Sequence, residues 1–319
     1  MAHKYSILLY YCYTPIADAE QYKIEHHLLC ISLRLLGRVI IAPEGINGTV
    51  SGLIDDCQQY MRTLRADSRF RDIDFKVEYA HEHAFEKINV RYKPEIVHSD
   101  LLHIKPWQKT GIHLEPSEFK KIKNDPDVVL VDFRSAYEHQ VGKFKGAITL
   151  DIENFRDFPD KISILAPFKN KKIITYCTGG IKCEKASAYL LEQGFENVYQ
   201  LHGGIIKYGI EEGGEDFEGK CYVFDNRVAV DINTVNPTVI SKCYVCASPS
   251  QRMVNCANPE CNEHVPICEE CGWKMKGACS ENCKNHPNIR PYDGTGYYQR
   301  ATHGYNPMIG VYPITKGEK

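Results

Sequence analysis

Residues 172–185, with the sequence KIITYCTGGIKCEK, decide the fold of the middle of the chain. The first five, 172–176, form a short run rich in β-branched residues, which is typical of a buried strand. Gly179 and Gly180 allow a tight turn, and the pattern over 185–193 predicts an amphipathic helix. A strand, a tight turn and a helix in this order predict an α/β domain with a parallel sheet. Further strands of this sheet are expected at 128–131 and 198–201.

Cys177 stands where the expected strand ends and the glycine turn begins. Backbone N–H groups of the turn and the N-terminus of the following helix stabilise negative charge there. Lys182 and Lys185 add positive charge nearby. The pKa of the thiol is therefore expected below the ~8.5 of a free cysteine, so Cys177 is a candidate nucleophile at neutral pH. The plainer alternative, a buried cysteine before an ordinary turn, accounts for fewer of these features.

Cys183 follows six residues later, across the same turn. Two interpretations stay open for it. It is either a resolving or second catalytic thiol, or a helix residue that packs inward. The first is the working interpretation, although a single loop cysteine suffices for ordinary sulfur transfer.

The residues before this domain alternate strand and helix signals in the order βαββαβ, which predicts a ferredoxin-like α+β domain. The first expected helix carries apolar residues at helical spacing, Ile24, Leu28 and Ile31, and Gly37 is expected to end it. Residues 43–48, PEGING, have the composition of a turn, and Asn47–Gly48 is a strong signal for a hairpin. The expected strands are 5–13, 39–41, 49–52 and 73–79, and the expected helices are 18–36 and 55–64.

Eight of the fourteen cysteines fall in four pairs near the end of the chain. The pairs are Cys243 with Cys246, Cys256 with Cys261, Cys268 with Cys271, and Cys279 with Cys283. Two of these pairs have the C-x-x-C spacing that lets both thiolates bind one ion, and eight thiolates suit two tetrahedral, structural zinc sites. The order in which the pairs combine, interleaved or sequential, stays open. A redox-active thiol cluster is the competing interpretation.

Composition excludes several classes of protein. The 319 residues carry a formal net charge of −2, so a nucleic-acid partner would have to bind a local basic patch. No apolar run reaches the ~18 residues that a membrane span needs, and no signal-peptide pattern opens the chain. We therefore expect a cytoplasmic protein without a membrane partner, in which cysteines stay reduced or bind metal.

These observations predict four segments. They are a ferredoxin-like domain at 1–95, a linker at 96–114, the α/β domain at 115–219 and a Cys-rich region at 220–319. The last region has few long apolar periods, so metal is expected to order it. Residues after about Ala301 are expected to form a tail.

Three motifs of the α/β domain resemble the rhodanese family. Residues 131–138, VDFRSAYE, match its first box, and 201–205 match its closing Leu-x-Gly-Gly motif. Residues 142–148 resemble its Gly-His-Ile-x-Gly-Ala stretch, with Lys143 and Phe144 in place of the histidine and isoleucine. The resemblance implies that Cys177 carries a persulfide. It also implies a structural role for Asp132 and Arg134. The loop residues that would hold the persulfide are Thr178, Gly179, Gly180, Ile181 and Lys182.

The combination of domains is similar to a narrower family, the bacterial rhodanese-domain tRNA uridine hydroxylases (the TrhO group). The loop CTGGIKCEK at 177–185 and the segment APEGINGT at 42–49 carry this resemblance. It implies an enzyme that uses molecular oxygen to hydroxylate the wobble uridine of tRNA to 5-hydroxyuridine. The family commonly has arginine where this chain has Lys182, so the charge is kept but the planar fork is lost.

Two other functions remain under consideration. One is a sulfurtransferase that passes a thiosulfate- or persulfide-derived sulfur from Cys177 to an acceptor. The other is a non-catalytic, zinc-dependent RNA-binding protein. The N-terminal domain and the Cys-rich region favour the hydroxylase, because simple sulfurtransferases need neither. No flavin or haem signature is identifiable in the sequence, so zinc is the one cofactor expected.

RNA contacts are expected from unpaired bases on exposed aromatic rings. Tyr92, Trp107 and Trp273 are candidates, beside basic segments at 87–93 and 169–172. For any one of these residues taken alone, a packed ring or a solvated lysine is the simpler interpretation.

Overall fold

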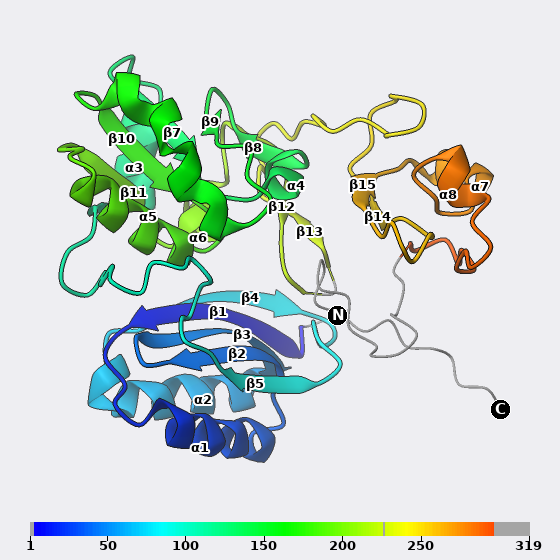
Figure 1. Ribbon diagram of the computed structural model, residues 1–319. Coiled ribbons are helices and arrows are strands. Elements are labelled where there is room, and N and C mark those ends of the chain that lie inside the picture. Colours follow the sequence, from blue (N-terminus) through cyan, green and yellow to red (C-terminus); the bar gives the residue numbers. More distant parts are fainter. Residues whose placement is uncertain (1–2, 226, 297–319) are drawn as a thin grey trace. The chain divides into compact units, whose positions relative to one another are not determined.

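The computed structural model describes residues 3–225 and 227–296, shown in Figure 1. The described residues up to 135, together with 146–212, form one compact unit. Residues 136–145 and the described residues from 213 onward form a second unit. The four segments expected from the sequence stay a prediction, and the expected tail after Ala301 lies outside the described residues. Every described helix is too short or too polar to cross a bilayer.

The first unit opens with a five-stranded sheet in the order β4-β1-β3-β2-β5. Both α1 and α2 cover the same face of this sheet, as Figure 1 shows. The elements are β1 Tyr5–Tyr13, α1 Ala19–Ser32, β2 Leu36–Ala42, β3 Gly45–Leu53, α2 Ile54–Ala66, β4 Asp74–Ala80 and β5 Ile88–Tyr92. The first four strands have the βαββαβ order and antiparallel neighbours of a ferredoxin-like domain, while β5 adds to β2 in parallel. The predicted fold of this region is confirmed.

Helix α1 turns a different face to the core than the apolar spacing predicts. Ile24, Leu28 and Ile31 are more than half exposed, and the buried positions are Tyr22, His26 and Cys30, with Ala19. Both faces of the helix carry large side chains at helical spacing, so the spacing alone does not identify the buried face. Tyr22, His26 and Cys30 are spaced four residues apart, so they fall on one side.

The hairpin between the second and third strands is present, but the predicted C-terminal end of α1 and the Asn47–Gly48 position of the turn are wrong. The helix ends at Ser32, and Gly37 lies inside β2, where a Cβ would come 2.2 Å from the Thr49 carbonyl oxygen. Residues 43–44 make the turn between β2 and β3, so Asn47 and Gly48 belong to β3. A Cβ on Gly48 would meet the Tyr10 hydroxyl at 2.2 Å. That glycine therefore makes room for a core ring and does not form a turn.

The second sheet of this unit has five parallel strands in the order β6-β11-β10-β7-β9. It is covered by helices, and it confirms the predicted α/β domain with a parallel sheet. The elements are β6 Ile112–Leu114, α3 Pro116–Ile122, β7 Val128–Asp132, β9 Ile148–Thr149, a 3₁₀ segment Phe155–Phe168, β10 Lys172–Tyr176, α5 Ile181–Glu192, β11 Val198–Leu201 and α6 Gly204–Glu212. Strand β6 comes from the segment 96–114.

The second unit combines two small sheets with the cysteine pairs. One of its hydrophobic clusters is built largely from cysteines, with Val254, Val265 and Ile267, and another contains Val141, Tyr222, Val228 and Met253. The elements are α4 Ala136–His139, β8 Gly142–Phe144, β12 Phe217–Tyr222, β13 Ala229–Asp231, β14 Met253–Asn255, β15 His264–Pro266, α7 Glu269–Lys274 and α8 Glu281–Lys284.

A buried ammonium joins the two sheets of the first unit. The Lys185 side chain on α5 is fully buried, and its Nζ lies 2.8 Å from Glu44 Oε2 and 3.0 Å from Glu95 Oε1. It also donates to the Leu101 carbonyl at 3.0 Å. Glu44 stands in the β2–β3 turn and accepts from the Ile96 amide. All three N–H donors of the ammonium are therefore used.

We expect Lys185→Met to destabilise the first unit by about 3–5 kcal/mol, because the change leaves two carboxylates buried without a counter-charge. Chemical denaturation followed by circular dichroism measures the loss. The matched control is Lys171→Met, which breaks an exposed ion pair with Asp127 and should cost at most about 1 kcal/mol. Equal losses of unfolding free energy in both variants would contradict the expected contribution of the buried network to stability.

Candidate active site and metal centres

The loop after β10 folds around the sulfur of Cys177. This thiol is only 1% exposed, and the Gly180 amide donates to its Sγ at 3.2 Å. Gly180 has a φ of 98°, which a residue with a Cβ rarely adopts. Helix α5 begins at the next residue, Ile181. Strand end, glycine turn and helix start therefore lie as the sequence predicts.

Burial by itself raises the pKa of the Cys177 thiol, but polar groups around it outweigh that effect. A hydrogen bond from Cys183, the charge of Lys182 and the amides of Lys182 and Gly180 lower the pKa to about 7. Burial and the hydrogen bond to Cys177 raise the pKa of the Cys183 thiol well above its usual value. The two thiols thus form a pair in which Cys183 keeps its proton and Cys177 is the thiolate.

Strand β1 covers this loop with the side chains on the face that points away from the hydrophobic core of the first sheet. A Cβ on Gly179 would lie 2.9 Å from Leu9, and one on Gly180 would lie 2.8 Å from the Tyr11 hydroxyl. The Tyr13 hydroxyl donates to the Ile181 carbonyl at 3.4 Å. The two glycines are therefore needed for the approach of β1 as well as for the turn.

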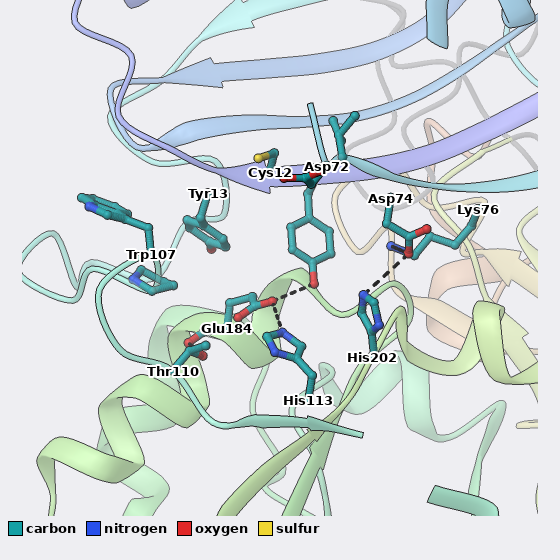
Figure 2. A pocket seen from close by; sticks show the side chains of 13 residues that line it. Cys12, Tyr13, Asp72, Asp74, Lys76, Trp107, Thr110, His113, Glu184 and His202 are labelled. Atoms are coloured by element: carbon teal, nitrogen blue, oxygen red, sulfur yellow. Dashed lines mark hydrogen bonds and ion pairs between the residues drawn. The ribbon is translucent and has the colours of Figure 1, made fainter. Parts of the chain in front are cut away.

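A cavity of about 250 Å³ lies beside the loop, between β1, β4 and α5 (Figure 2). Glu184 of α5 is its central carboxylate. Its Oε1 accepts from the Tyr11 hydroxyl at 3.0 Å and lies 2.8 Å from His113 Nε2, while Gln200 donates to Oε2 at 3.0 Å. Hydrogen bonds from His113, Gln200 and Tyr11 hold the pKa of Glu184 low although its burial raises it. The hydrogen bond to this carboxylate raises the pKa of His113.

The far end of the cavity is charged. The Lys76 side chain is 3% exposed, and its Nζ lies 3.1 Å from Asp74 Oδ2. His202 Nε2 lies 3.8 Å from the same oxygen. Figure 2 shows these three residues grouped at one end and the rings of Trp107 and Tyr13 at the other.

The structure brings the predicted loop residues together, whereas Asp132 and Arg134 pair with each other at the end of a neighbouring strand. Residues 177–183 form one continuous turn and helix start. Asp132 and Arg134 form a fully buried pair at the end of β7, in which Arg134 Nη2 donates to Asp132 at 2.6 Å. The next strand lies directly beside them, because the Phe133 amide donates to the Tyr176 carbonyl. This placement agrees with a structural role for Asp132 and Arg134, which stays a prediction.

Sequence reasoning named Trp107 among the residues that line the cavity but missed most of the others. Tyr11, Glu184 and His113 come from three distant segments, and of these three only Glu184 lies in a motif that signals a site, the loop 177–185. One signal was available. Tyrosines alternate along β1, at positions 11 and 13, on the face opposite its buried Leu8 and Tyr10. Large side chains on both faces of an antiparallel strand indicate that something packs on each face.

The eight paired cysteines form two groups that can each hold a metal ion. One group is Cys243, Cys246, Cys268 and Cys271, and the other is Cys256, Cys261, Cys279 and Cys283. This is the interleaved arrangement, first pair with third and second with fourth. Within the groups, the Cys246–Cys268 and Cys261–Cys279 sulfurs are 3.7 Å apart, and Cys279–Cys283 are 3.8 Å apart. Four ligands at 2.3 Å around a tetrahedral zinc ion would be about 3.8 Å from one another, so the geometry fits.

Comparison with known families covers almost the whole described chain. Residues 5–96 match the "UPF0176 acylphosphatase like domain", and residues 115–211 match the "Rhodanese-like domain". Residues 218–284 match the family described as "Rhodanase C-terminal". The resemblance of the middle segment to rhodaneses is therefore confirmed.

Three curated relatives carry one name, tRNA uridine(34) hydroxylase. The protein of Cytophaga hutchinsonii is 66% identical over 307 residues, which cover 96% of this chain and 98% of that one. A Staphylococcus aureus protein is 50% identical over 75% of this chain and 76% of its own. An Enterococcus faecalis protein is 49% identical over 75% and 77%. At this identity and coverage, the chain belongs to the tRNA uridine(34) hydroxylase family.

Proposed function

We propose that this protein hydroxylates the uracil ring of the wobble uridine of tRNA at C5, with molecular oxygen as the oxidant and Cys177 as the reactive group. The observation that carries the proposal is the 66% identity to a protein named tRNA uridine(34) hydroxylase over nearly the full length of both chains. The buried Cys177 thiolate and the cavity beside its loop support a chemical site at this place.

The reaction must balance in atoms and electrons. The C5–H bond of uracil becomes C5–OH with one atom of O₂, and the other oxygen atom leaves as water. That reduction takes two electrons and two protons. Oxidation of the Cys177 thiolate and the Cys183 thiol to a disulfide releases two electrons and one proton, and the second proton comes from water. We propose this pair as the electron donor, because the two thiols are hydrogen-bonded to each other.

Zinc is the metal that we propose for both cysteine groups of the second unit. Four thiolates around one ion leave no position open for water, which is typical of structural zinc. One hydrophobic cluster of this unit is made largely of the same cysteines, so binding of the metal would supply much of the folding free energy of that part. The residues that would hold the ions are the eight cysteines of the two groups.

A persulfide on Cys177 would support sulfur transfer as a second function. The loop amide that lies 3.2 Å from Sγ suits a negatively charged outer sulfur as well as a thiolate. For that function, the measurement would be the amount of thiolated nucleosides in tRNA instead of 5-hydroxyuridine.

We expect Cys177→Ser to abolish hydroxylation. In cells that lack the gene, wild type should restore 5-hydroxyuridine derivatives in bulk tRNA, and the variant should leave them at background, as measured by nucleoside mass spectrometry. Cys57→Ala, a buried thiol of α2, is the matched control and should restore them. Full restoration by Cys177→Ser would exclude a reactive role for this thiol.

A single-turnover experiment tests the electron donor. Reduced protein, freed of small thiols and given unmodified tRNA and oxygen, should form at most one 5-hydroxyuridine per chain. Peptide mass spectrometry should then show a disulfide between Cys177 and Cys183. Cys183→Ser should form no product under these conditions. Product without the disulfide, or an unchanged yield from Cys183→Ser, would assign the electrons to another donor.

Metal analysis tests the two centres. The purified protein should contain two zinc ions per chain, and Cys246→Ser should contain about one, because one tetrahedral site loses a ligand. Cys221→Ala, a buried thiol of the same unit outside both groups, should keep two. A strong chelator should make the second unit sensitive to protease. Two ions retained in Cys246→Ser would contradict this ligand set.

A further inference from the structure

A second pocket, which lies wholly in the second unit, is lined by positive charge. It has a volume of about 300 Å³ and is bordered by β12, β13 and β14. The side chains of Lys220, Arg227 and Arg252 line it, and no carboxylate does so in the described part of the chain. Val228 and Met253 also line it, and both belong to one hydrophobic cluster. The two sides of the pocket therefore pack on each other.

Arg252 carries a charge that no nearby carboxylate balances. Its guanidinium donates to three neutral oxygens, namely the Ile267 carbonyl at 3.3 Å, the Tyr292 hydroxyl and the Gly294 carbonyl. Among residues 3–225 and 227–296, no acidic side chain pairs with it, and two of its five N–H groups have no acceptor. The side chain is partly buried. A cation in such a place attracts an anion that can accept from the two remaining donors.

The other two cations have carboxylate partners that do not line the pocket. Lys220 Nζ lies 3.1 Å from Asp231 Oδ2, and the Asp231 side chain is 68% exposed. Arg227 Nη2 lies 2.6 Å from Asp225 Oδ2. Three cations with two carboxylates leave a net charge of +1, and the positive groups are the ones on the pocket wall. This charge is the complement of one phosphodiester group, which carries a single negative charge.

An exposed tryptophan stands next to the pocket. A Cβ on Gly294, which lines the pocket, would lie 3.1 Å from the Trp273 ring. Trp273 is 56% exposed, and its ring meets the Tyr292 ring edge-on with the ring centres 5.1 Å apart. Tyr292 in turn holds the Arg252 guanidinium through its hydroxyl. Basic groups beside an exposed aromatic ring are typical of surfaces that hold single-stranded nucleic acid.

We propose that this pocket binds a phosphodiester group of the tRNA backbone, with Arg252 as its main contact and Lys220 beside it. The cavity between β1, β4 and α5 is a poor phosphate site, because the carboxylates of Asp72, Asp74 and Glu184 line it. The second unit would thus hold the RNA backbone, while the first unit carries the reactive thiol. The choice of tRNA as the ligand rests on the proposed function.

Lys220→Met tests the pocket in the full-length protein, because it removes one cation and keeps the length of the side chain. Fluorescence anisotropy of labelled, unmodified tRNA at about 50 to 200 mM salt measures the affinity and its salt dependence. Loss of one phosphate contact should weaken binding about three- to tenfold and reduce the slope of log K against log salt by about 1. Lys145→Met, an exposed lysine of the same unit that does not line the pocket, is the matched control and should change neither.

Arg252→Gln removes the unbalanced charge and should weaken tRNA binding at least as much as Lys220→Met. Because Arg252 also bonds to three backbone and side-chain oxygens of its own unit, circular dichroism and zinc content check that this variant folds. The result for Lys220→Met does not depend on it. In both variants KM for tRNA should rise while kcat stays near the wild-type value, because a remote phosphate contact is the same in the ground state and the transition state.

The outcomes separate this inference from the proposed function. If Lys220→Met and folded Arg252→Gln bind tRNA as the wild type does, with the same salt dependence, the pocket does not hold RNA and the function stands. If inorganic phosphate changes the fluorescence of Trp273 in the Trp107→Phe protein and tRNA does not, the pocket takes a free anion and the inference is overturned. If both variants lose affinity but the wild type forms no 5-hydroxyuridine, the inference stands and the proposed function fails.

Discussion

A fully buried lysine holds the first unit together. The Lys185 ammonium pairs with Glu44 from the β2–β3 turn and with Glu95 from the segment after β5. Burial of three charges is costly, so such a network stabilises little compared with apolar packing. Its effect is positional, because only one arrangement of the two sheets satisfies all three groups. Lys185 and Glu95 lie 90 positions apart in the sequence, so this network specifies a tertiary arrangement.

The reactive loop depends on that arrangement. Lys185 lies on the helix that begins directly after the glycine turn, so the pairing that fixes α5 also fixes where β1 passes over Cys177. The side chains of Leu9 and Tyr11 then press on the two glycines. Their cover keeps the thiolate at 1% exposure, and the polar groups around it still lower its pKa to about 7. A buried, ionised thiol beside a polar cavity is the result.

The second unit depends on its cysteines for stability. Its strands are short, at three to six residues, and the cluster around its paired cysteines has few aliphatic side chains. Small segments of this kind need cross-links or metal to fold. In each group, one pair of sulfurs comes from a loop and the other pair from residues in or next to a short helix, α7 or α8. Each group therefore ties two separate parts of the unit to one point.

Local sequence was sufficient for those features that neighbouring residues build by themselves. The loop KIITYCTGGIKCEK predicts its strand, turn and helix because these contacts span a few residues, and the C-x-x-C pairs predict metal binding for the same reason. The order βαββαβ likewise followed from local periodicity. Features that depend on which distant surfaces meet were beyond reach of such patterns. Four features required the folded chain. They are the buried face of α1, the exact turn at 43–44, the interleaved pairing of the cysteines, and the assembly of Tyr11, His113 and Glu184 beside Cys177. Each is decided by packing between segments far apart in sequence, and local spacing carries no information about it.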